Sequence, residues 1–482
     1  MTSVRTRFAP SPTGFLHVGG LRTALYNYLF AKKEKGAFIL RIEDTDQSRK
    51  VEGAMENLIE TLEWAGLHFD EGPGREGDFG PYIQSQRINL YQKCAHQLVE
   101  EGNAYYCFCT QQRLEKLRDQ RIAAKLAGSY DRYCRDIPKS EVQEKLKRGE
   151  PHVIRMKVPL TGELTFSDAI RESVTIAYAV LDDQVILKSD GYPTYHLAVV
   201  VDDHFMKISH VIRGEEWLPS TPKHIMLYNY FGWEAPRFAH LPLLLNPDKS
   251  KLSKRQGDVA VEDYRAKGYL KEALVNFVAF LGWNPGDERE LFSLEELVHE
   301  FSLERVGKSG AVFNIEKLDW LNFEHLRRKP EADVLRMIKD HLKRSAIGGE
   351  KLDDQYLLSV ISAMRERVTF IKDIIEKSPY FFESPKEYDP ADVKKRWKPE
   401  SSMYLKKLAE QFGALDVPTK EGYEAALQQT AETLQIKNSD LIHPLRLAVS
   451  GMGAGPGLYD ILFILGKNET IGRITTAIEV LH

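Results

Sequence analysis

The chain has 482 residues, of which 43% are hydrophobic and 28% charged, and its formal net charge is −4. This length predicts about three domains with ample cores, and the composition is that of an ordinary globular protein. The charge does not favour general nucleic-acid binding, and no apolar run approaches the roughly twenty residues that cross a bilayer. The first residues lack the pattern of a signal peptide. With four cysteines, the sequence favours a reducing, cytoplasmic location without a membrane.

The beginning of the chain predicts a strand, a tight loop and a helix. Residues 4–9 can form a short strand, and Pro10, Pro12 and Gly14 then interrupt any regular structure. After this loop, apolar residues recur at helical spacing to about residue 33. The start of such a helix offers unpaired N–H groups and a positive dipole end, both of which suit a phosphate.

Three residues of this loop fit a nucleotide site. Gly19 and Gly20 carry no side chain where a ligand must approach closely, and His17 could donate a hydrogen bond to a phosphate. Alone, a glycine-rich loop is weak evidence, and a single loop histidine more often serves packing or lies at the surface. A second element lies far downstream at residues 251–255 (KLSKR). Its lysines, Lys251 and Lys254, could close over the phosphates of a nucleotide and neutralise their charge.

An acidic cluster follows the next predicted strand. Residues 37–42 (AFILRI) predict a buried parallel strand, which leads into residues 43–46 (EDTD). Ligands of open α/β sheets bind beyond the carboxyl ends of the strands, so Glu43 is placed to meet a substrate ammonium group. The alternative is that the cluster forms a helix N-cap. We expect Glu43 to bind substrate and residues 44–46 to cap a helix that runs through Leu62.

The middle of the chain predicts an insertion into a nucleotide-binding fold. Glycines and prolines in residues 71–81 mark a boundary. The predicted elements that follow are helices near 86–101 and 111–126 and strands at 152–158, 185–188, 192–201 and 208–212. Because the last two resume the apolar-strand pattern, residues 83–189 form the insertion.

Three of the four cysteines, Cys107, Cys109 and Cys134, lie in this insertion. A Cys-x-Cys pair and a third cysteine can form a closed zinc site when a fourth ligand completes the tetrahedron. The candidates for this ligand are Tyr130 and Asp136, neither of which is a usual zinc ligand. The alternative is that the cysteines remain reduced free thiols.

Two arginines and an acid predict recognition of a charged small molecule. Arg213 follows the strand predicted at 208–212, and a buried arginine presents a planar fork that binds a carboxylate through two hydrogen bonds. A substrate with two carboxylates and one ammonium group needs two cations and one anion, and Arg7, Arg213 and Glu43 form such a set. The alternative is that Arg213 forms a surface salt bridge. Tyr195 and His196 follow a predicted strand and could face the same pocket as Glu43.

Several motifs together resemble the class I aminoacyl-tRNA synthetases. Residues 17–20 (HVGG) and 251–255 (KLSKR) resemble the HIGH and KMSKS motifs of that class. The remaining motifs, which are similar to those of bacterial glutamyl-tRNA synthetases, are residues 10–14 (PSPTG), 41–46 (RIEDTD), 191–196 (GYPTYH) and 211–217 (VIRGEEW). The resemblance covers essentially the whole chain, and the combination is highly specific.

The resemblance implies an α/β Rossmann-type class I catalytic domain with an α+β insertion, followed by an all-α C-terminal anticodon-binding region. The implied parts are residues 1–82 and 190–256 for the two halves of the catalytic domain, 83–189 for the insertion that binds the tRNA acceptor end, 257–329 for a mostly helical stem-contact domain and 330–482 for the anticodon-binding domain. After Pro330 the sequence is indeed helical in pattern, with periodic segments near 333–344, 354–376, 403–413, 420–434, 441–449 and 458–465.

The resemblance also implies the reaction. ATP, accompanied by Mg²⁺, and L-glutamate form glutamyl-adenylate and pyrophosphate, and the terminal ribose hydroxyl of tRNA(Glu) then attacks the mixed anhydride. Positioning and electrostatics suffice for the first step, so no covalent nucleophile is needed. The expected protein is a monomer.

The resemblance implies roles for a set of site residues. The implied residues are Arg7, Ser11, Glu43, Tyr195 and Arg213 for glutamate; Pro12, Thr13, Gly14, His17, Gly20 and Lys254 for ATP; His17, Gly19, Gly20, Lys251 and Lys254 for catalysis; Arg367 and Arg446 for the anticodon; and Cys107, Cys109, Tyr130, Cys134 and Asp136 for one structural Zn²⁺. Some relatives bind zinc in this place, and some carry histidine where this chain has Asp136.

Four alternatives differ from this interpretation. A glutaminyl-tRNA synthetase would have a β-rich C-terminal part, and a truncated glutamyl transferase would lack residues 330–482. A non-catalytic tRNA-binding paralogue would not need His17, Glu43, Arg213 and Lys254. A non-discriminating enzyme would also charge tRNA(Gln), but Arg367, which we expect in mid-helix, matches the family position where arginine is associated with rejection of that tRNA.

Overall fold

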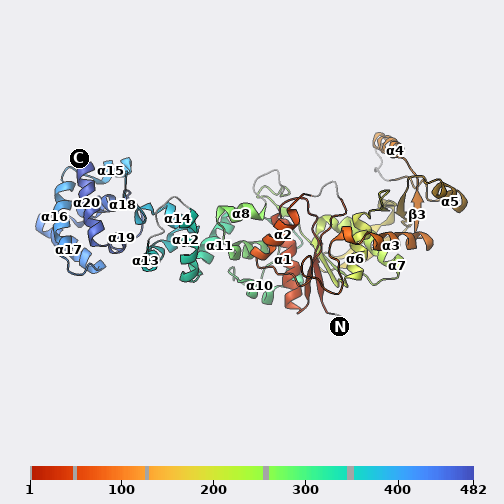
Figure 1. Ribbon diagram of the computed structural model, residues 1–482, viewed down its shortest axis with the longest axis horizontal. Helices are drawn as coiled ribbons and strands as arrows, with labels where there is room; N and C mark the ends of the chain where they lie inside the picture. The colour runs from red at the N-terminus through yellow and green to blue at the C-terminus, as the bar shows by residue number, and fades with distance from the viewer. Residues whose placement is uncertain (1–2, 47–50, 125–129, 253–259, 345–351, 482) are drawn as a thin grey trace. The chain divides into compact units, whose positions relative to one another are not determined.

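The computed structural model describes residues 3–46, 51–124, 130–252, 260–344 and 352–481. The chain divides into two compact units (Figure 1). The first contains Met1–Lys267 and Lys271–Ile315, and the second contains Gly268–Leu270 and Glu316–His482. Each unit is described by itself below.

The first unit is built on parallel strands near the beginning and middle of the chain. Strands β1 (Arg5–Phe8) and β2 (Ala37–Leu40) are parallel, with Arg5 opposite Ala37. A second sheet has the order β6-β5-β9-β8, in which β8 and β9 are parallel. Its strands are β5 (Glu163–Asp168), β6 (Glu172–Ala177), β8 (His210–Gly214) and β9 (Arg237–Leu241). The Ser209 amide, just before β8, donates to the Arg5 carbonyl, so β1 lies beside β8.

Helix α1 (Val18–Lys33) packs against β1, β2 and β8. Its apolar face is fully buried at Leu21, Leu25 and Leu29, and Lys32 and Lys33 in its last turn suit the negative end of the helix dipole. The other helices of the unit are α2 (Ala54–Trp64), α3 (Ile88–Glu100), α4 (Gln111–Ala123), α5 (Lys139–Lys147), α6 (Tyr195–Phe205), α7 (Thr221–Phe231), α8 (Val261–Lys267), α9 (Lys271–Ala279) and α10 (Leu294–Glu300).

The predicted insertion carries its own sheet. Strands β3 (Ala104–Cys107), β4 (Val153–Met156) and β7 (Val185–Leu187) form antiparallel pairs in the order β3-β4-β7. A further parallel pair, β10 (Leu244–Leu245) and β11 (Ala311–Val312), joins residues that flank the KLSKR segment to a later part of the unit.

The strand predicted at 192–201 is wrong, because helix α6 begins at Tyr195. The residues from Leu197 to Asp203 are all buried, so the apolar run has no polar side to reveal a helical period. A short apolar run that is buried on every side does not distinguish a strand from a helix. Thr194, in an extended conformation, precedes the helix and separates it from Pro193.

The capping role predicted for residues 44–46 is also wrong. Helix α2 begins at Ala54, after Gly53, which has a φ of 76° and makes no side-chain cap. The Asp44 carboxylate instead accepts hydrogen bonds from the Ser85 amide at 2.8 Å and the Ser85 hydroxyl at 2.7 Å. Asp44 therefore fixes the loop after β2 to a distant segment.

The second unit is helical in its described residues, and α16, α17, α18 and α20 gather in one bundle (Figure 1). Its helices are α11 (Ile315–Arg328), α12 (Glu331–Arg344), α13 (Asp354–Met364), α14 (Ile371–Glu376), α15 (Pro390–Arg396), α16 (Ser401–Gly413), α17 (Lys420–Leu434), α18 (Asn438–Ser450), α19 (Leu458–Leu465) and α20 (Lys467–Val480). Helices α15 and α20 were not predicted.

The helix predicted at 354–376 is divided into α13 and α14. Helix α13 ends at Met364, and Arg365–Arg367 form one 3-10 turn, so Arg367 lies at a helix end and not in mid-helix. The Arg365 side chain donates to the carbonyls of Leu326 and Lys329. These bonds hold the chain where the helical period of the sequence is interrupted.

Among the described residues, the structure contains no helix with the length and apolar character required to traverse a bilayer.

Candidate functional site

A cavity of about 740 Å³ lies where β1, β2 and β8 end. All five residues predicted to bind glutamate line it, namely Arg7, Ser11, Glu43, Tyr195 and Arg213. Arg7 comes from β1, Arg213 from β8, Tyr195 from the first turn of α6, and Glu43 from the segment after β2. His196 is not among the lining residues. Its Nδ1 lies 3.0 Å from Nε2 of His224, behind the cavity wall.

Glu43 is held in a buried network of charges. Its Oε1 lies 3.2 Å from Nη2 of Arg41, and Nη1 of Arg41 donates to Asp203 at 2.8 Å. Nε of Arg7 donates to the same Asp203 oxygen at 3.1 Å. Burial raises the pKa of Glu43 to about 7, although Arg41 and Arg7 act in the opposite direction. Glu43 is therefore a carboxyl group that a further positive charge in the cavity would ionise fully.

Arg213 is buried and donates to neutral groups. Nε donates to Nε2 of His240 at 3.1 Å, Nη2 donates to Oγ1 of Thr221 at 3.0 Å and to Nδ1 of His224 at 3.2 Å, and Nη1 donates to the Tyr195 hydroxyl at 3.2 Å. The alternative of a surface salt bridge is thus wrong, since Arg213 is 5% exposed and forms no ion pair among the described residues.

The Arg213 fork and the Tyr195 hydroxyl present donors to the cavity. A guanidinium carries five N–H donors, and four of them have the partners named above. The fifth, on Nη1, lies beside the Tyr195 hydroxyl, whose own proton remains to be donated. Trp217 packs on the Tyr195 ring with a centroid separation of 4.1 Å and fixes its orientation. Two adjacent donors that have no acceptor among the described residues match a carboxylate.

The start of α1 lies beside the segments that flank KLSKR. His17 caps the helix, because its Nδ1 accepts from the Gly19 amide at 2.9 Å, and the ring proton is therefore on Nε2. His17 also forms an antiparallel bridge with Ala260, and Leu245 forms one with Lys251. Segments more than 200 residues apart thus meet at the α1 N-terminus.

The predicted ATP-binding residues are placed unequally. Thr13 lines the cavity, whereas Pro12, Gly14, His17 and Gly20 are not among its lining residues. A Cβ at Gly20 would lie 2.7 Å from Cδ1 of Leu16, so a side chain here would displace the end of the Leu16 side chain. Lys251 is exposed in a hairpin. Lys254 lies outside the described residues.

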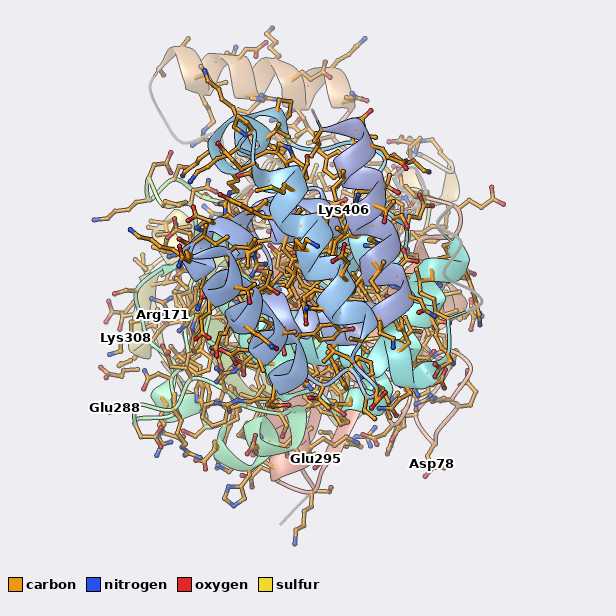
Figure 2. All side chains as sticks on the ribbon, turned by 90° about the vertical axis from the view of Figure 1, so that its left-hand side faces the viewer. Asp78, Arg171, Glu288, Glu295, Lys308 and Lys406 are labelled. Carbon is orange, nitrogen blue, oxygen red and sulfur yellow. The ribbon has the colours of Figure 1, made fainter. Side chains whose placement is uncertain are left out.

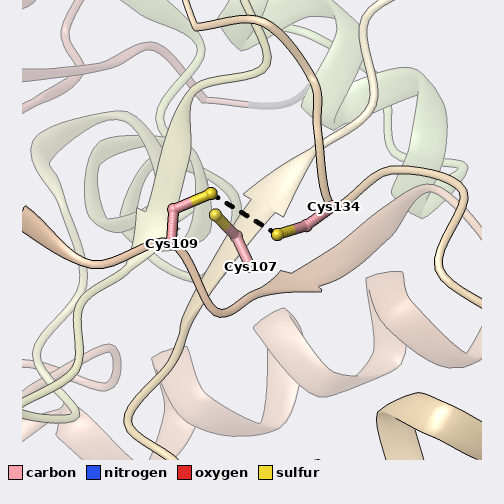
Figure 3. A group of neighbouring side chains, drawn as sticks. All are labelled: Cys107, Cys109 and Cys134. Atoms are coloured by element: carbon pink, nitrogen blue, oxygen red, sulfur yellow. Dashed lines mark hydrogen bonds between the residues drawn. The ribbon is translucent and has the colours of Figure 1, made fainter. Parts of the chain in front are cut away.

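The three cysteines of the insertion converge (Figure 3). The Sγ atoms of Cys107, Cys109 and Cys134 lie within 4.8 Å of one another. The Tyr130 hydroxyl lies 3.3 Å from Sγ of Cys107 and 3.5 Å from Sγ of Cys109. Hydrogen bonding with Cys134 and Tyr130 lowers the pKa of Cys107 to about 4, against the effect of burial. Asp136 is exposed and is not part of this cluster.

These donors fit a zinc ion. Three thiol sulfurs and one phenol oxygen supply four ligand atoms, three of them buried with their residues, and thiolates are the ligands that structural zinc prefers. Within this pair of neighbouring thiols the pKa of Cys107 is lowered and that of Cys134 is raised, so Cys107 ionises first.

The two predicted anticodon residues lie in different surroundings. Arg367 is exposed and lines a groove of about 840 Å³ with Glu366 and Lys420. Arg446 is half-buried, and its Nη1 donates to the Pro456 carbonyl at 2.8 Å. Because Pro456 also lines the groove, Arg446 supports the loop that forms one of its walls.

Sequence reasoning missed the buried charges behind the cavity. Arg41 interrupts the apolar strand segment, and Asp202 and Asp203 directly follow three valines. Charged residues are rarely buried unless they are paired. Their position within an apolar run could therefore have indicated a buried ion-pair network. Arg41 forms ion pairs with both Asp202 and Asp203.

Comparisons with known proteins agree with this geometry. The model of the family described as tRNA synthetases class I (E and Q), catalytic domain, matches residues 3–320, and the anticodon binding domain model matches residues 333–478. The chain is 53% identical to a glutamate–tRNA ligase of Chloroherpeton thalassium over 494 residues, which cover 99% of this chain and 98% of the relative. It is 54% identical to a glutamate–tRNA ligase of Chlorobium chlorochromatii over 491 residues, with the same coverage.

Solved structures show the same similarity. A glutamate–tRNA ligase from Elizabethkingia meningosepticum, crystallised in complex with its amino acid, has a TM-score of 0.95 and 41% identity, and the match covers all of both chains. A glutamate–tRNA synthetase from Elizabethkingia anophelis has a TM-score of 0.91 and 40% identity over 99% of this chain and 100% of that one.

Proposed function

The chain belongs to the class I tRNA synthetases for glutamate and glutamine, and we propose that its cavity binds L-glutamate through Arg7, Glu43 and Arg213. The activity is that of a glutamate–tRNA ligase, which joins glutamate to tRNA at the expense of ATP. The observation that carries the proposal is the meeting of two arginines and one acid at the ends of β1, β2 and β8.

Charge complementarity assigns the parts of glutamate to the cavity. Nη1 of Arg213 and the Tyr195 hydroxyl are adjacent donors for one carboxylate. Arg7 provides a second cation, whose charge Asp203 partly balances. The Glu43 carboxylate accepts hydrogen bonds from the ammonium group, and the positive charge of that group keeps Glu43 ionised. A glutamine side-chain amide would place an N–H group against this pair of donors, so the donor pair favours glutamate.

ATP is proposed to bind beside the start of α1. The positive end of that helix and the ring Nε2–H of His17 suit phosphate oxygens, and Mg²⁺ would enter with ATP. Lys251 and Lys254 are proposed to offset the charge that develops as pyrophosphate leaves. The glutamate carboxylate attacks the α-phosphate, and the terminal ribose hydroxyl of tRNA then attacks the adenylate. Because the substrates react with each other directly, the protein accelerates the reaction by positioning them.

A structural Zn²⁺ is proposed at Cys107, Cys109 and Cys134, with Tyr130 as the fourth ligand. The support is the convergence of the three sulfurs around the Tyr130 hydroxyl. The ion would tie the end of β3 to the segment that follows α4, and it takes no part in adenylate formation.

The remaining assignments concern the domains that contact tRNA, the oligomeric state and the location in the cell. We propose that residues 1–82 and 190–256 form the catalytic domain, that residues 83–189 bind the acceptor end of tRNA(Glu), that residues 257–329 contact the stem and that residues 330–482 bind the anticodon. We further propose a monomer that acts in the reducing cytoplasm, which agrees with its four free cysteines.

Aminoacylation with purified components tests the proposal. Purified protein should charge tRNA(Glu) with glutamate in the presence of ATP and Mg²⁺ and should not charge it with glutamine. Arg213→Ala should lose most of this activity. Normal charging by Arg213→Ala would contradict the role proposed for the cavity arginine.

A further inference from the structure

Arg213 is joined to a buried carboxylate through a histidine. Nε of Arg213 donates to Nε2 of His240 at 3.1 Å, and Nδ1 of the same ring lies 2.6 Å from Oδ2 of Asp168. The side chains of His240 and Asp168 are fully buried. Asp168 ends β5 and His240 lies in β9, the strand between β5 and β8. The connection therefore crosses three neighbouring strands of one sheet.

The carboxylate determines which ring nitrogen carries the proton. Against the effect of burial, the His240 hydrogen bond and backbone donors lower the pKa of Asp168, so Asp168 is ionised and can only accept. Burial lowers the pKa of His240, so the ring is neutral and has a single N–H. That proton is therefore on Nδ1, and the lone pair on Nε2 faces Nε of Arg213 at 3.1 Å and the Thr221 hydroxyl at 3.1 Å.

Asp168 is itself held rigidly. Its other oxygen, Oδ1, accepts from the amides of Ile170 at 3.0 Å and Arg171 at 2.8 Å. The Arg171 side chain donates to the His240 carbonyl at 3.3 Å and to the Lys308 carbonyl at 2.6 Å. Arg171 and Lys308 are labelled beside each other in Figure 2. The two oxygens of Asp168 thus have separate tasks, since one fixes a turn and the other orients the ring.

We propose that Asp168 and His240 are positioning residues that set the orientation of the Arg213 guanidinium and thereby the selection of glutamate over glutamine. The inference rests on the role proposed above for Arg213. Because Nε is fixed by His240, the Nη1 edge is directed at the Tyr195 hydroxyl and the cavity. The buried charge of Asp168 also balances that of Arg213 without an ion pair that would compete with the substrate carboxylate.

Asp168→Asn tests the proposal with little change in shape. The amide oxygen can keep the contacts of Oδ1 to the turn, whereas the amide nitrogen would donate to Nδ1 of His240. The ring proton would then move to Nε2 and face the Nε–H of Arg213, so that two donors oppose each other. We expect the KM for glutamate to rise about tenfold or more, the size of one lost hydrogen bond to a charged group. The KM for ATP should not change, and the preference for glutamate over glutamine should fall.

Two variants at position 240 distinguish the ring's acceptor, which faces Arg213, from its donor, which faces Asp168. His240→Gln keeps an acceptor near the position of Nε2, and His240→Asn keeps a donor near the position of Nδ1. We expect His240→Gln to retain more of the glutamate preference than His240→Asn, although both lose packing. Equal losses of glutamate preference would contradict the proposal.

The control is Asp183→Asn, in a different part of the first unit. Asp183 is also fully buried and accepts hydrogen bonds from Tyr105 and Arg135, but it does not line the cavity. The Asp183→Asn variant should have a lower melting temperature than the unaltered protein and the same KM for glutamate. If Asp168→Asn only lowers the melting temperature in the same way, or raises the KM for ATP and glutamate equally, the proposal is wrong. If Arg213→Ala also leaves the KM for glutamate unchanged, the proposed role of Arg213 fails first.

Discussion

Glu43 links substrate binding to pH. The pKa of this buried carboxyl is raised to about 7, and only its ionised form can pair with the ammonium group of glutamate. We therefore expect the KM for glutamate to rise as the pH falls through about 7, measured at saturating ATP and tRNA. The KM of Glu43→Gln should be higher and should not change over this range. Parallel pH profiles for the two proteins would contradict the assignment.

The same shift has a consequence for stability. A carboxyl whose pKa is higher in the folded protein than in the unfolded chain binds its proton more tightly when folded. Its contribution to the free energy of unfolding is therefore greatest below the ordinary carboxyl range and falls as the pH rises through about 7. Glu43→Gln, which has no charge to bury, should unfold at a higher temperature than the unaltered protein above this pH, as measured by calorimetry.

Arg213 provides the positive charge that a glutamate carboxylate requires. Removing it leaves the carboxylate without a charged hydrogen-bond donor, a loss of about 1.5–3 kcal/mol or roughly ten- to a hundredfold in glutamate affinity. We expect Arg213→Ala to raise the KM for glutamate by this factor and to affect the KM for ATP much less. Steady-state aminoacylation measures both.

A surface arginine supplies the control for this variant. Arg289 is about half exposed and pairs with Asp287 and Glu300, as a solvent-facing salt-bridge residue does. Arg289→Ala should leave the KM for glutamate unchanged, because Arg289 does not line the cavity, and it should change stability little, because a surface ion pair contributes about 0–1 kcal/mol. Similar losses of glutamate affinity in both variants would mean that Arg213 has no specific role.

The sequence predicted the residues that line the cavity, but it did not predict the buried residues that hold them in place. Arg7, Glu43 and Arg213 could be grouped from the sequence because a substrate with two carboxylates and one ammonium group requires their charges. The partners of these residues could not be predicted, because they depend on tertiary packing. Asp168 and His240 lie 72 positions apart, and the sequence alone does not show that β5 and β9 are neighbours.

At the scale of elements, sequence periodicity succeeded where one face is exposed. Helix α12 alternates buried Val334, Ile338 and Leu342 with charged residues, so its helical period is visible in the sequence. Helix α6 is buried over most of its length, and its valines were interpreted as a strand. Periodicity reports the contrast between two faces, and it fails when both faces are apolar.

The cysteine cluster is a second feature that depends on how elements meet. If Tyr130 is the fourth ligand, Tyr130→Phe should weaken zinc binding, whereas Asp136→Ala should not, because Asp136 is exposed outside the cluster. Metal analysis of protein purified without a chelator should give about one zinc per chain for the unaltered protein and Asp136→Ala. Competition with a chromogenic chelator should rank the affinities. A metal-free, fully active protein would indicate that the cysteines are free thiols.

At the scale of the whole molecule, one helical unit follows a unit that contains every described strand. This order was predicted from the sequence, since the segments after Pro330 all have a helical period, whereas the N-terminal part combines helical segments with apolar runs typical of strands. The boundary was harder to predict. Residues 271–315 belong to the first unit, because helices α9 and α10 pack on α1. This contact could not be predicted, because no local pattern in the sequence indicates it.

The choice between tRNA(Glu) and tRNA(Gln) is proposed to depend on the second unit. Arg367 is exposed in a groove of about 840 Å³, so its guanidinium is accessible to a base. The two anticodons differ at the third base, which is cytosine for glutamate and guanine for glutamine. The guanidinium can donate to the carbonyl oxygen of cytosine, whereas the larger guanine would crowd it. One good base contact provides about 1–3 kcal/mol, or roughly ten- to a hundredfold discrimination.

We expect the protein to charge tRNA(Glu) in preference to tRNA(Gln), and Arg367→Gln to raise the ratio of tRNA(Gln) to tRNA(Glu) charging. The matched control is Arg336→Gln, an exposed arginine of the same unit that pairs with Asp333 and does not line the groove. The ratio is measured as kcat/KM for each purified tRNA at saturating glutamate and ATP. Because only a base contact depends on the anticodon, a shared loss of charging on both tRNAs would indicate a phosphate contact. Equal charging of both tRNAs by the unaltered protein would contradict the assignment of Arg367 altogether.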